Sequence, residues 1–307
     1  MRRAATAAAV ALLGAADPSD GGQLRVMTDR PDRANSVDTI WPGMAQIESG
    51  ITFLRDAAGD RPVRRLKTET ALRVGLAETL EADVLTDGFV WERSEGGGAS
   101  GMGDTTLAAK WRLLDAEGWR PGLGLLPFVK LPTASAGKGL GSGRVDFGGQ
   151  GAAGQDLPLD LHVDVNVGMA AISLAERPGG LFLQRSVAAS FSWVGVDRFF
   201  PFWEVFYDSR DRPAGRHSVG TDFGLVFTLH DRVAVDVAGQ VGLAGNAPDW
   251  SVRAGFTLLF GALTDTGAPG AARRAPRAAA EGAAVDRQPE GTYHSGVARV
   301  RRARASQ

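Results

Sequence analysis

Alternation of apolar and polar side chains along most of this chain is the feature that most constrains its fold. In DLHVDVNVGM, residues 160–169, the odd-numbered side chains are apolar, whereas the even-numbered ones up to Asn166 are polar. LKTETALRVGL, residues 66–76, sets Lys67 and Arg73 between apolar or threonine neighbours in the same way. Because successive side chains of a β-strand point to opposite faces, each stretch predicts a strand with one apolar and one charged face.

The same pattern recurs along the chain, so we expect about twelve strands. Each is about 10 to 14 residues long, which exceeds the usual length of soluble strands and suits a strand that crosses a membrane. The predicted strands are 44–54, 66–76, 80–91, 104–114, 119–131, 144–156, 159–172, 181–193, 198–208, 217–229, 233–243 and 250–260.

The connections between these strands alternate in length. Short ones fall at 77–79, 115–118, 157–158, 194–197 and 230–232. Longer polar or glycine-rich ones fall at 55–65, 92–103, 132–143, 173–180 and 209–216, with a shorter one at 244–249. Short periplasmic turns and longer external loops are typical of outer-membrane barrels, and a soluble sandwich has no reason to show this asymmetry. The prediction is an all-β fold, a transmembrane antiparallel up-and-down β-barrel whose closure leaves no strand edge in lipid.

Two irregularities interrupt the scheme. Proline cannot donate a hydrogen bond to a neighbouring strand, so we expect bulges or rim positions at Pro121, Pro127 and Pro201. In the predicted strand 80–91, strict alternation would place Glu81 and Asp83 on the same face as Phe89 and Trp91. Because charged and apolar side chains would then share one face, we expect a register break before the loop.

Four segments are expected. Residues 1–16, with two arginines followed by an alanine-rich apolar run, are typical of a signal peptide. Residues 17–43 are expected to form an N-terminal periplasmic segment, and 44–260 the barrel. Residues 261–307 are rich in alanine and arginine with little apolar periodicity, which predicts a disordered tail.

In a barrel whose apolar face contacts lipid, the charged face must line the lumen. The candidate lumen residues are Glu48, Lys67, Glu69, Arg73, Glu81, Asp83, Asp104, Lys110, Arg112, Lys130, Arg144, Asp146, Asp160, His162, Asp164, Glu204, Asp222, Asp236 and Arg253. Long side chains of both signs are expected to pair across a lumen that twelve strands make narrow and partly occluded. Four tryptophans beside predicted turns or loops are candidates for the aromatic girdle at the membrane interfaces: Trp111, Trp119, Trp193 and Trp250.

Composition removes several other classes of function. The 307 residues carry a net charge of −1 and no cysteine, which argues against a nucleic-acid partner, thiol chemistry and cysteine-bound metals. With four scattered histidines, we expect no metal and no cofactor. His217 and Ser218 are adjacent on a strand and therefore point to opposite faces, so they do not form a nucleophile and its base.

Four blocks of the sequence carry a resemblance to a known family. The MetA-pathway of phenol degradation family is resembled by TDRPDRANSVDTIWPGMAQIESG (28–50), ETALRVGLAETLEADV (69–84), GMGDTTLAAKWRLLDAEGWRPGLGLLPFVKLPT (101–133) and WSVRAGFTLLF (250–260). The resemblance implies an outer-membrane barrel associated with passage of small molecules, aromatic compounds being the candidate class. It departs at the C-terminus, because such barrels commonly end on an aromatic residue and this chain continues past Phe260.

The function expected from these observations is a passive outer-membrane channel or transporter. Its partners would be outer-membrane lipid, a small-molecule solute and the barrel-assembly machinery. A structural or surface-binding barrel with a closed lumen is the alternative, and a lipid-modifying enzyme is a weaker one.

Overall fold

The computed structural model describes residues 26–57, 62–174, 177, 179–210 and 213–261. The predicted signal peptide, residues 17–25 and nearly all of the predicted tail lie outside the described residues. Across the described chain the secondary structure is almost entirely β-strand, and no described helix is long and apolar enough to cross a membrane.

Thirteen strands follow one another along the described part of the chain. Their bounds are β1 (Met44–Asp56), β2 (Val63–Ala77), β3 (Leu80–Ser94), β4 (Gly97–Met102), β5 (Thr105–Leu114), β6 (Gly122–Leu131), β7 (Asp146–Leu157), β8 (Leu161–Ser173), β9 (Leu181–Trp193), β10 (Phe199–Asp208), β11 (Ser218–His230), β12 (Val233–Gly245) and β13 (Trp250–Gly261). A single 3-10 turn, η1 (Ala136–Lys138), lies between β6 and β7.

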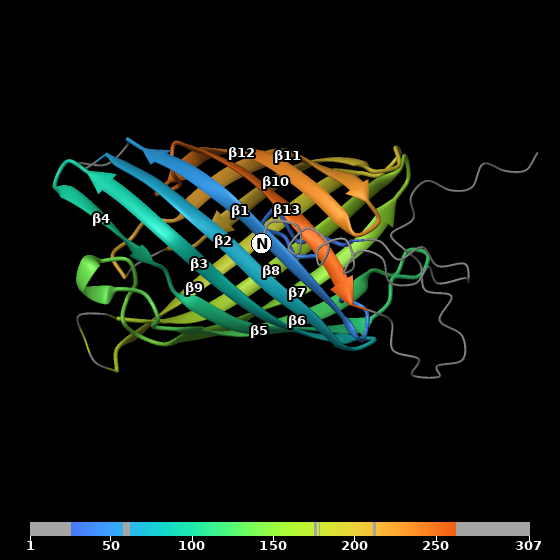
Figure 1. Ribbon diagram of the computed structural model, residues 1–307, viewed down its shortest axis with the longest axis horizontal. Coiled ribbons are helices and arrows are strands. Elements are labelled where there is room, and N and C mark those ends of the chain that lie inside the picture. The colour runs from blue at the N-terminus through green and yellow to red at the C-terminus, as the bar shows by residue number, and fades with distance from the viewer. Residues whose placement is uncertain (1–25, 58–61, 175–176, 178, 211–212, 262–307) are drawn as a thin grey trace, which may run out of the picture.

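The strands close into one antiparallel barrel (Figure 1). Consecutive strands pair with each other except β4 and β5, and β1 pairs with both β2 and β13, which closes the sheet. β4 and β5 both pair with β3, one with each half of it, so together they occupy a single position in the wall. The barrel therefore has the twelve wall positions that the alternation predicts.

One predicted loop is wrong. Residues 92–103, expected as a long external loop, instead continue β3 to Ser94 and form β4, leaving Glu95 and Gly96 as the turn. The expected register break in β3 is confirmed, because the pairing with β2 shifts between Lys67 and Glu69. Thr68 accepts a hydrogen bond from the backbone N–H of Phe89 at this bulge.

The prolines occupy the positions that their missing N–H allows. Pro201 pairs with β11, but the pairing of β10 with β9 begins only at Phe202. Pro121 precedes β6. Pro127 lies at a gap in the pairing of β6 with β5, because Phe128 and Leu125 are paired but the residues between them are not. The register of the two strands is the same on both sides of this gap.

The outer face of the barrel is apolar and the inner face is charged. Ile51, Leu72, Leu107, Val167 and Val237 are exposed on the outside, as are many other large apolar side chains. Charged side chains, by contrast, are among the most deeply buried: Glu48, Arg73, Glu81, Lys110, Glu204 and Asp222. A soluble protein has the opposite arrangement, so the outer face is suited to lipid.

Residues 26–43, the described part of the segment before β1, lie inside the barrel, and for these residues this corrects the expectation of a periplasmic segment over 17–43. Its backbone N–H groups bond to Glu48 on β1, Asn166 on β8 and Glu204 on β10. These strands lie around the circumference of a closed barrel, so only a chain within the lumen reaches all of them. We call residues 26–43 the inner segment.

Two ends of the barrel are distinguished by their connections. The terminus end is where β1 begins and β13 ends, and its turns include 78–79 and 231–232. The loop end is opposite and carries longer connections such as 132–145.

Candidate functional site: the barrel lumen

The centre of the lumen is an ionic network around Arg73 of β2. Its guanidinium lies 2.7 Å from Glu48, 2.8 Å from Glu81 and 3.1 Å from Asp29 of the inner segment. Arg73, Glu48 and Glu81 are each at most 3% exposed. Buried charges are tolerated only when they are paired and hydrogen-bonded, and this cluster meets that condition.

Lys110 of β5 extends the network to the next strand. Its ammonium lies 2.5 Å from Asp29 and donates to the backbone carbonyl of Asp38 at 3.2 Å. Glu81 also accepts the backbone N–H of Ile40 at 2.6 Å. The inner segment is thus held at both of its ends by side chains of the barrel wall.

Arg30 of the inner segment contacts the wall on both sides of β1. Its guanidinium lies 3.3 Å from Asp236 of β12 and 3.6 Å from Glu69 of β2. It occupies the space left by Gly50 and Gly255, which are cross-strand partners on the inner face. A Cβ built on Gly50 would stand 2.2 Å from the Arg30 guanidinium, and one on Gly255 would stand 2.7 Å from it. Glycine at both positions therefore makes room for Arg30.

Glu204 of β10 fixes the middle of the inner segment. Its carboxylate accepts the backbone N–H groups of Arg33 at 2.9 Å and of Ala34 at 2.7 Å. The Arg33 side chain turns towards the loop end, where it lies 3.0 Å from Asp208 and its guanidinium stacks 4.0 Å from the centre of the Phe206 ring.

The inner segment also packs through apolar contacts. Three small clusters of buried side chains join it to the wall. They are Val26, Ile40, Met44, Ala234 and Leu259; Ala34, Ala188 and Phe206; and Val37, Leu126 and Ala152. Both polar and apolar contacts therefore hold this segment in one place across the lumen.

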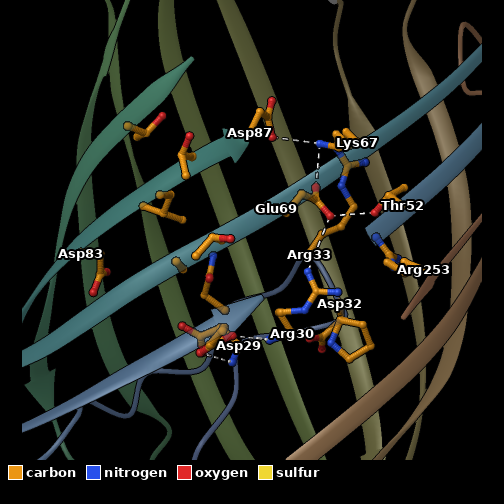
Figure 2. A pocket seen from close by; sticks show the side chains of 18 of the residues that line it. Asp29, Arg30, Asp32, Arg33, Thr52, Lys67, Glu69, Asp83, Asp87 and Arg253 are labelled. Atoms are coloured by element: carbon orange, nitrogen blue, oxygen red, sulfur yellow. Dashed lines mark hydrogen bonds and ion pairs between the residues drawn. The ribbon is translucent and has the colours of Figure 1, made fainter. Parts of the chain in front are cut away.

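A cavity of about 660 Å³ lies on the loop-end side of the inner segment (Figure 2). Lys67 projects into it between Glu69 at 2.6 Å and Asp87 at 3.2 Å, and Thr52 donates to Glu69 at 2.7 Å. Asp83, Asp29 and Arg30 line its floor and sides. We call it the loop-end cavity.

A smaller cavity of about 180 Å³ lies on the terminus-end side and is less polar. Phe200, Phe202 and Val226 form an apolar part of its lining. His162 stands between two carboxylates, 2.7 Å from Asp156 and 3.2 Å from Asp164. We call it the terminus-end cavity.

The two cavities share two lining residues, Arg30 and Asp32 of the inner segment. Burial, together with the nearby carboxylates of Glu204 and Asp164, raises the pKa of Asp32 well above its usual range. Asp32 belongs to the inner segment and not to the barrel wall. Arg30 and Asp32 therefore stand between the two cavities.

Most residues expected in the lumen lie on the inner face, and they are brought together by the inner segment. Those on the inner face, or directed into the lumen, are Glu48, Lys67, Glu69, Arg73, Glu81, Asp83, Asp104, Lys110, Arg112, Lys130, Asp146, His162, Asp164, Glu204, Asp222, Asp236 and Arg253. Lys130 pairs with Asp104 and Asp146, and Arg253 pairs with Asp222.

Two of the expected lumen residues lie elsewhere. Asp160 is exposed in the turn between β7 and β8, where its φ is +57°, and β8 begins at Leu161, two residues later than expected. Arg144 lies in the connection before β7 and not on a strand. Both corrections concern strand ends, which alternation alone locates least well.

The four girdle candidates all have exposed side chains. Trp111 and Trp193 are at the terminus end of their strands, and Trp119 is in the turn before β6. Trp250 is at the loop end, 5.6 Å from the ring of Phe53. Their places agree with two interfacial levels, one at each end of the barrel.

The contribution of the inner segment was missed by the alternation pattern. Asp29, Arg30, Asp32, Arg33 and Asn35 lie in TDRPDRANS, which has no period of two. The sequence signal that could have indicated this segment is the high density of charged residues in TDRPDRANS, shortly before the first strand. This stretch lies within a block that carries the family resemblance.

Comparison with known families agrees with this architecture. Residues 28–260 match the family described as "Putative MetA-pathway of phenol degradation". The chain belongs to this family. The match begins within the inner segment and ends within β13, so the family pattern includes both the wall and the segment inside it.

A solved outer-membrane channel shares this fold at low sequence identity. The COG4313 outer membrane channel from Pseudomonas putida F1 is 15% identical, with a TM-score of 0.61 over 78% of this chain and 99% of that one. The NanC porin is 10% identical, with a TM-score of 0.47 over 69% of this chain and 98% of that one. No protein of curated function matches the sequence.

Proposed function

We propose that this protein is a passive channel for small molecules in the bacterial outer membrane. The apolar outer face is suited to lipid, and the closed barrel leaves no unpaired strand edge within it. The loop end faces the outside and the terminus end faces the periplasm, in keeping with the longer connections at the loop end.

The observation that carries this proposal is the pair of cavities on the two sides of Arg30 and Asp32, which line both of them. A solute entering from outside would cross the charged loop-end cavity, pass these two side chains and reach the less polar terminus-end cavity. Because the inner segment crosses the lumen and bonds to β1, β8 and β10, the route suits only small solutes.

Small aromatic solutes are the class we favour. Phe200 and Phe202 supply an apolar wall in the terminus-end cavity, while Asp32 and Asp164 supply carboxylates near it. This combination suits a ring that carries a hydroxyl or cationic group. The family description, which refers to phenol degradation, agrees with this class.

An enzymatic role is less well supported by the same cavity. His162 and Ser192 are cross-strand neighbours and both line it. However, both ring nitrogens of His162 contact carboxylates, Asp156 and Asp164. Neither nitrogen is then placed to take a proton from Ser192, as a nucleophile of this kind requires.

Liposome swelling with the purified full-length protein tests the channel. We expect arabinose to enter protein-containing liposomes and raffinose to be excluded, because the passage beside the inner segment is narrow. If arabinose is excluded as well, a structural or surface-binding barrel with a closed lumen replaces the channel.

A second pair of solutes tests the aromatic class separately. Phenyltrimethylammonium and cyclohexyltrimethylammonium have the same charge and similar size, but only the first has an aromatic ring. We expect the first to enter several-fold faster, and Phe202→Ala to reduce that difference. Equal rates would reject aromatic preference and leave the channel itself standing.

A further inference from the structure

Three arginines form a row on the outside of the barrel at its loop end. Arg55 of β1 is paired in register with Arg64 of β2, which is paired in register with Arg93 of β3. All three side chains are exposed. Because paired positions on neighbouring strands are about 5 Å apart, the row presents three positive charges side by side. We call these residues the arginine row.

The arginine row shares the lipid-facing phase of its strands. Two residues nearer to the middle of the barrel, the next outward row is Phe53, Leu66 and Trp91, which are also paired in register. On β13, Val252 is paired with Phe53 and extends this apolar row, and Trp250 is paired with Arg55. The ring of Trp250 lies 5.6 Å from that of Phe53, so it also contacts the apolar row. The charges therefore stand directly above an apolar band, at the level where membrane headgroups begin.

Like charges at directly opposed cross-strand positions repel each other. On the inward phase of the same strands the chain supplies a partner, because Arg65 lies 2.5 Å from Glu92. On the outward phase, none of the three arginines forms an ion pair or a side-chain hydrogen bond with the part of the chain that the structure describes. An external anion would remove this repulsion.

We propose that the arginine row binds the phosphate groups of an anionic lipid in the outer leaflet. Guanidinium groups bind phosphate through two parallel hydrogen bonds, and three adjacent ones match a headgroup with more than one phosphate. The continuous row of Phe53, Leu66 and Trp91 would receive the acyl chains. This apolar row favours a lipid over free phosphate, because free phosphate has no acyl chain to contact it.

Native mass spectrometry of the full-length protein with diphosphorylated lipid A measures this binding directly. We expect Arg55→Gln/Arg64→Gln/Arg93→Gln to weaken binding on the order of 100-fold, since each basic side chain near an anionic lipid surface contributes about fivefold in affinity. Arg64→Gln alone, at the centre of the row, should cause a smaller loss in the same direction. Heat-modifiable migration reports whether each variant is folded.

The matched control removes two arginines at the other end of the barrel. Arg120→Gln/Arg198→Gln lies in terminus-end turns and should leave lipid A binding unchanged. The proposal is overturned if folded Arg64→Gln and the triple variant bind lipid A as wild type does. It is also overturned if phosphate-free lipid A binds equally well, or if inorganic phosphate alone displaces the lipid at similar concentration.

Discussion

The guanidinium of Arg30 lies 3.3 Å from the carboxylate of Asp236, a residue 206 positions later in the chain. Asp236 has a side chain that is 1% exposed, and that of Arg30 is 13% exposed. This contact ties the inner segment to β12 through Arg30, the side chain that lines both cavities. It makes the stability of the barrel and the width of its passage depend on the same side chain.

Replacing Arg30 by methionine should therefore destabilise the barrel. The change keeps much of the side-chain volume but removes the charge that pairs with the buried carboxylate of Asp236. Breaking such a buried pair lowers the free energy of unfolding by about 3 kcal/mol. Urea unfolding of the refolded protein measures the loss. Asp236→Asn in the Arg30→Met background should recover part of it, and no recovery would mean that the two residues do not interact in solution.

Asp32 should make stability depend on pH. The pKa of Asp32 is raised in the folded chain above its ordinary value of about 4. At pH values between the ordinary and the raised pKa, the folded state therefore holds more protons than the unfolded state. Stability then falls as the pH rises through this window. Asp32→Asn removes the loss, so the variant should gain more over wild type at about pH 8 than at about pH 3. An equal difference in urea midpoint at both pH values would contradict this assignment.

The two faces of the wall should respond differently to an added charge. Val167 on β8 is 59% exposed on the outer face, and Val167→Arg should cost about 2 to 4 kcal/mol near the middle of the bilayer. Thr106→Arg, in the lining of the loop-end cavity, should cost much less. Asn166 is unsuitable as the inner control because its side chain bonds to Asn35 of the inner segment. Equal urea midpoints for the two arginine variants would contradict the assignment of Val167 to the outer face and Thr106 to the inner face.

The orientation of the barrel can be tested with single cysteines, since the chain has none. Glu95→Cys, in the turn between β3 and β4, should react with a membrane-impermeant maleimide on intact cells. Glu117→Cys, in the turn before β6, should react only after the outer membrane is permeabilised. The opposite labelling pattern would invert the topology.

The period of two located the wall well because it reports which face of a strand meets lipid. Strand 181–193 agrees with β9 at both ends. The hairpin formed by β3 and β4 was missed because EGGGASGMG has few side chains that can alternate. Glycine permits a strand there without indicating one.

The contents of the lumen were only partly predictable. Opposite charges in the lumen were expected to pair, and Arg73 does pair with Glu81. Arg112 instead lies near Asp38 and Asp115. The inner segment could not be found from periodicity, because its backbone N–H groups make many of its contacts and such contacts leave no pattern in the sequence.

Single-channel current in a planar bilayer tests most directly whether the lumen conducts past Arg30 and Asp32. The account predicts a small current for wild type and a larger one for Arg30→Ala/Asp32→Ala, whose shorter side chains leave more room between the two cavities. The control, Glu117→Ala/Arg120→Ala, removes an ion pair in an exposed terminus-end turn and should conduct as wild type does. Currents that are absent from all three proteins, or equal in all three, would contradict the account.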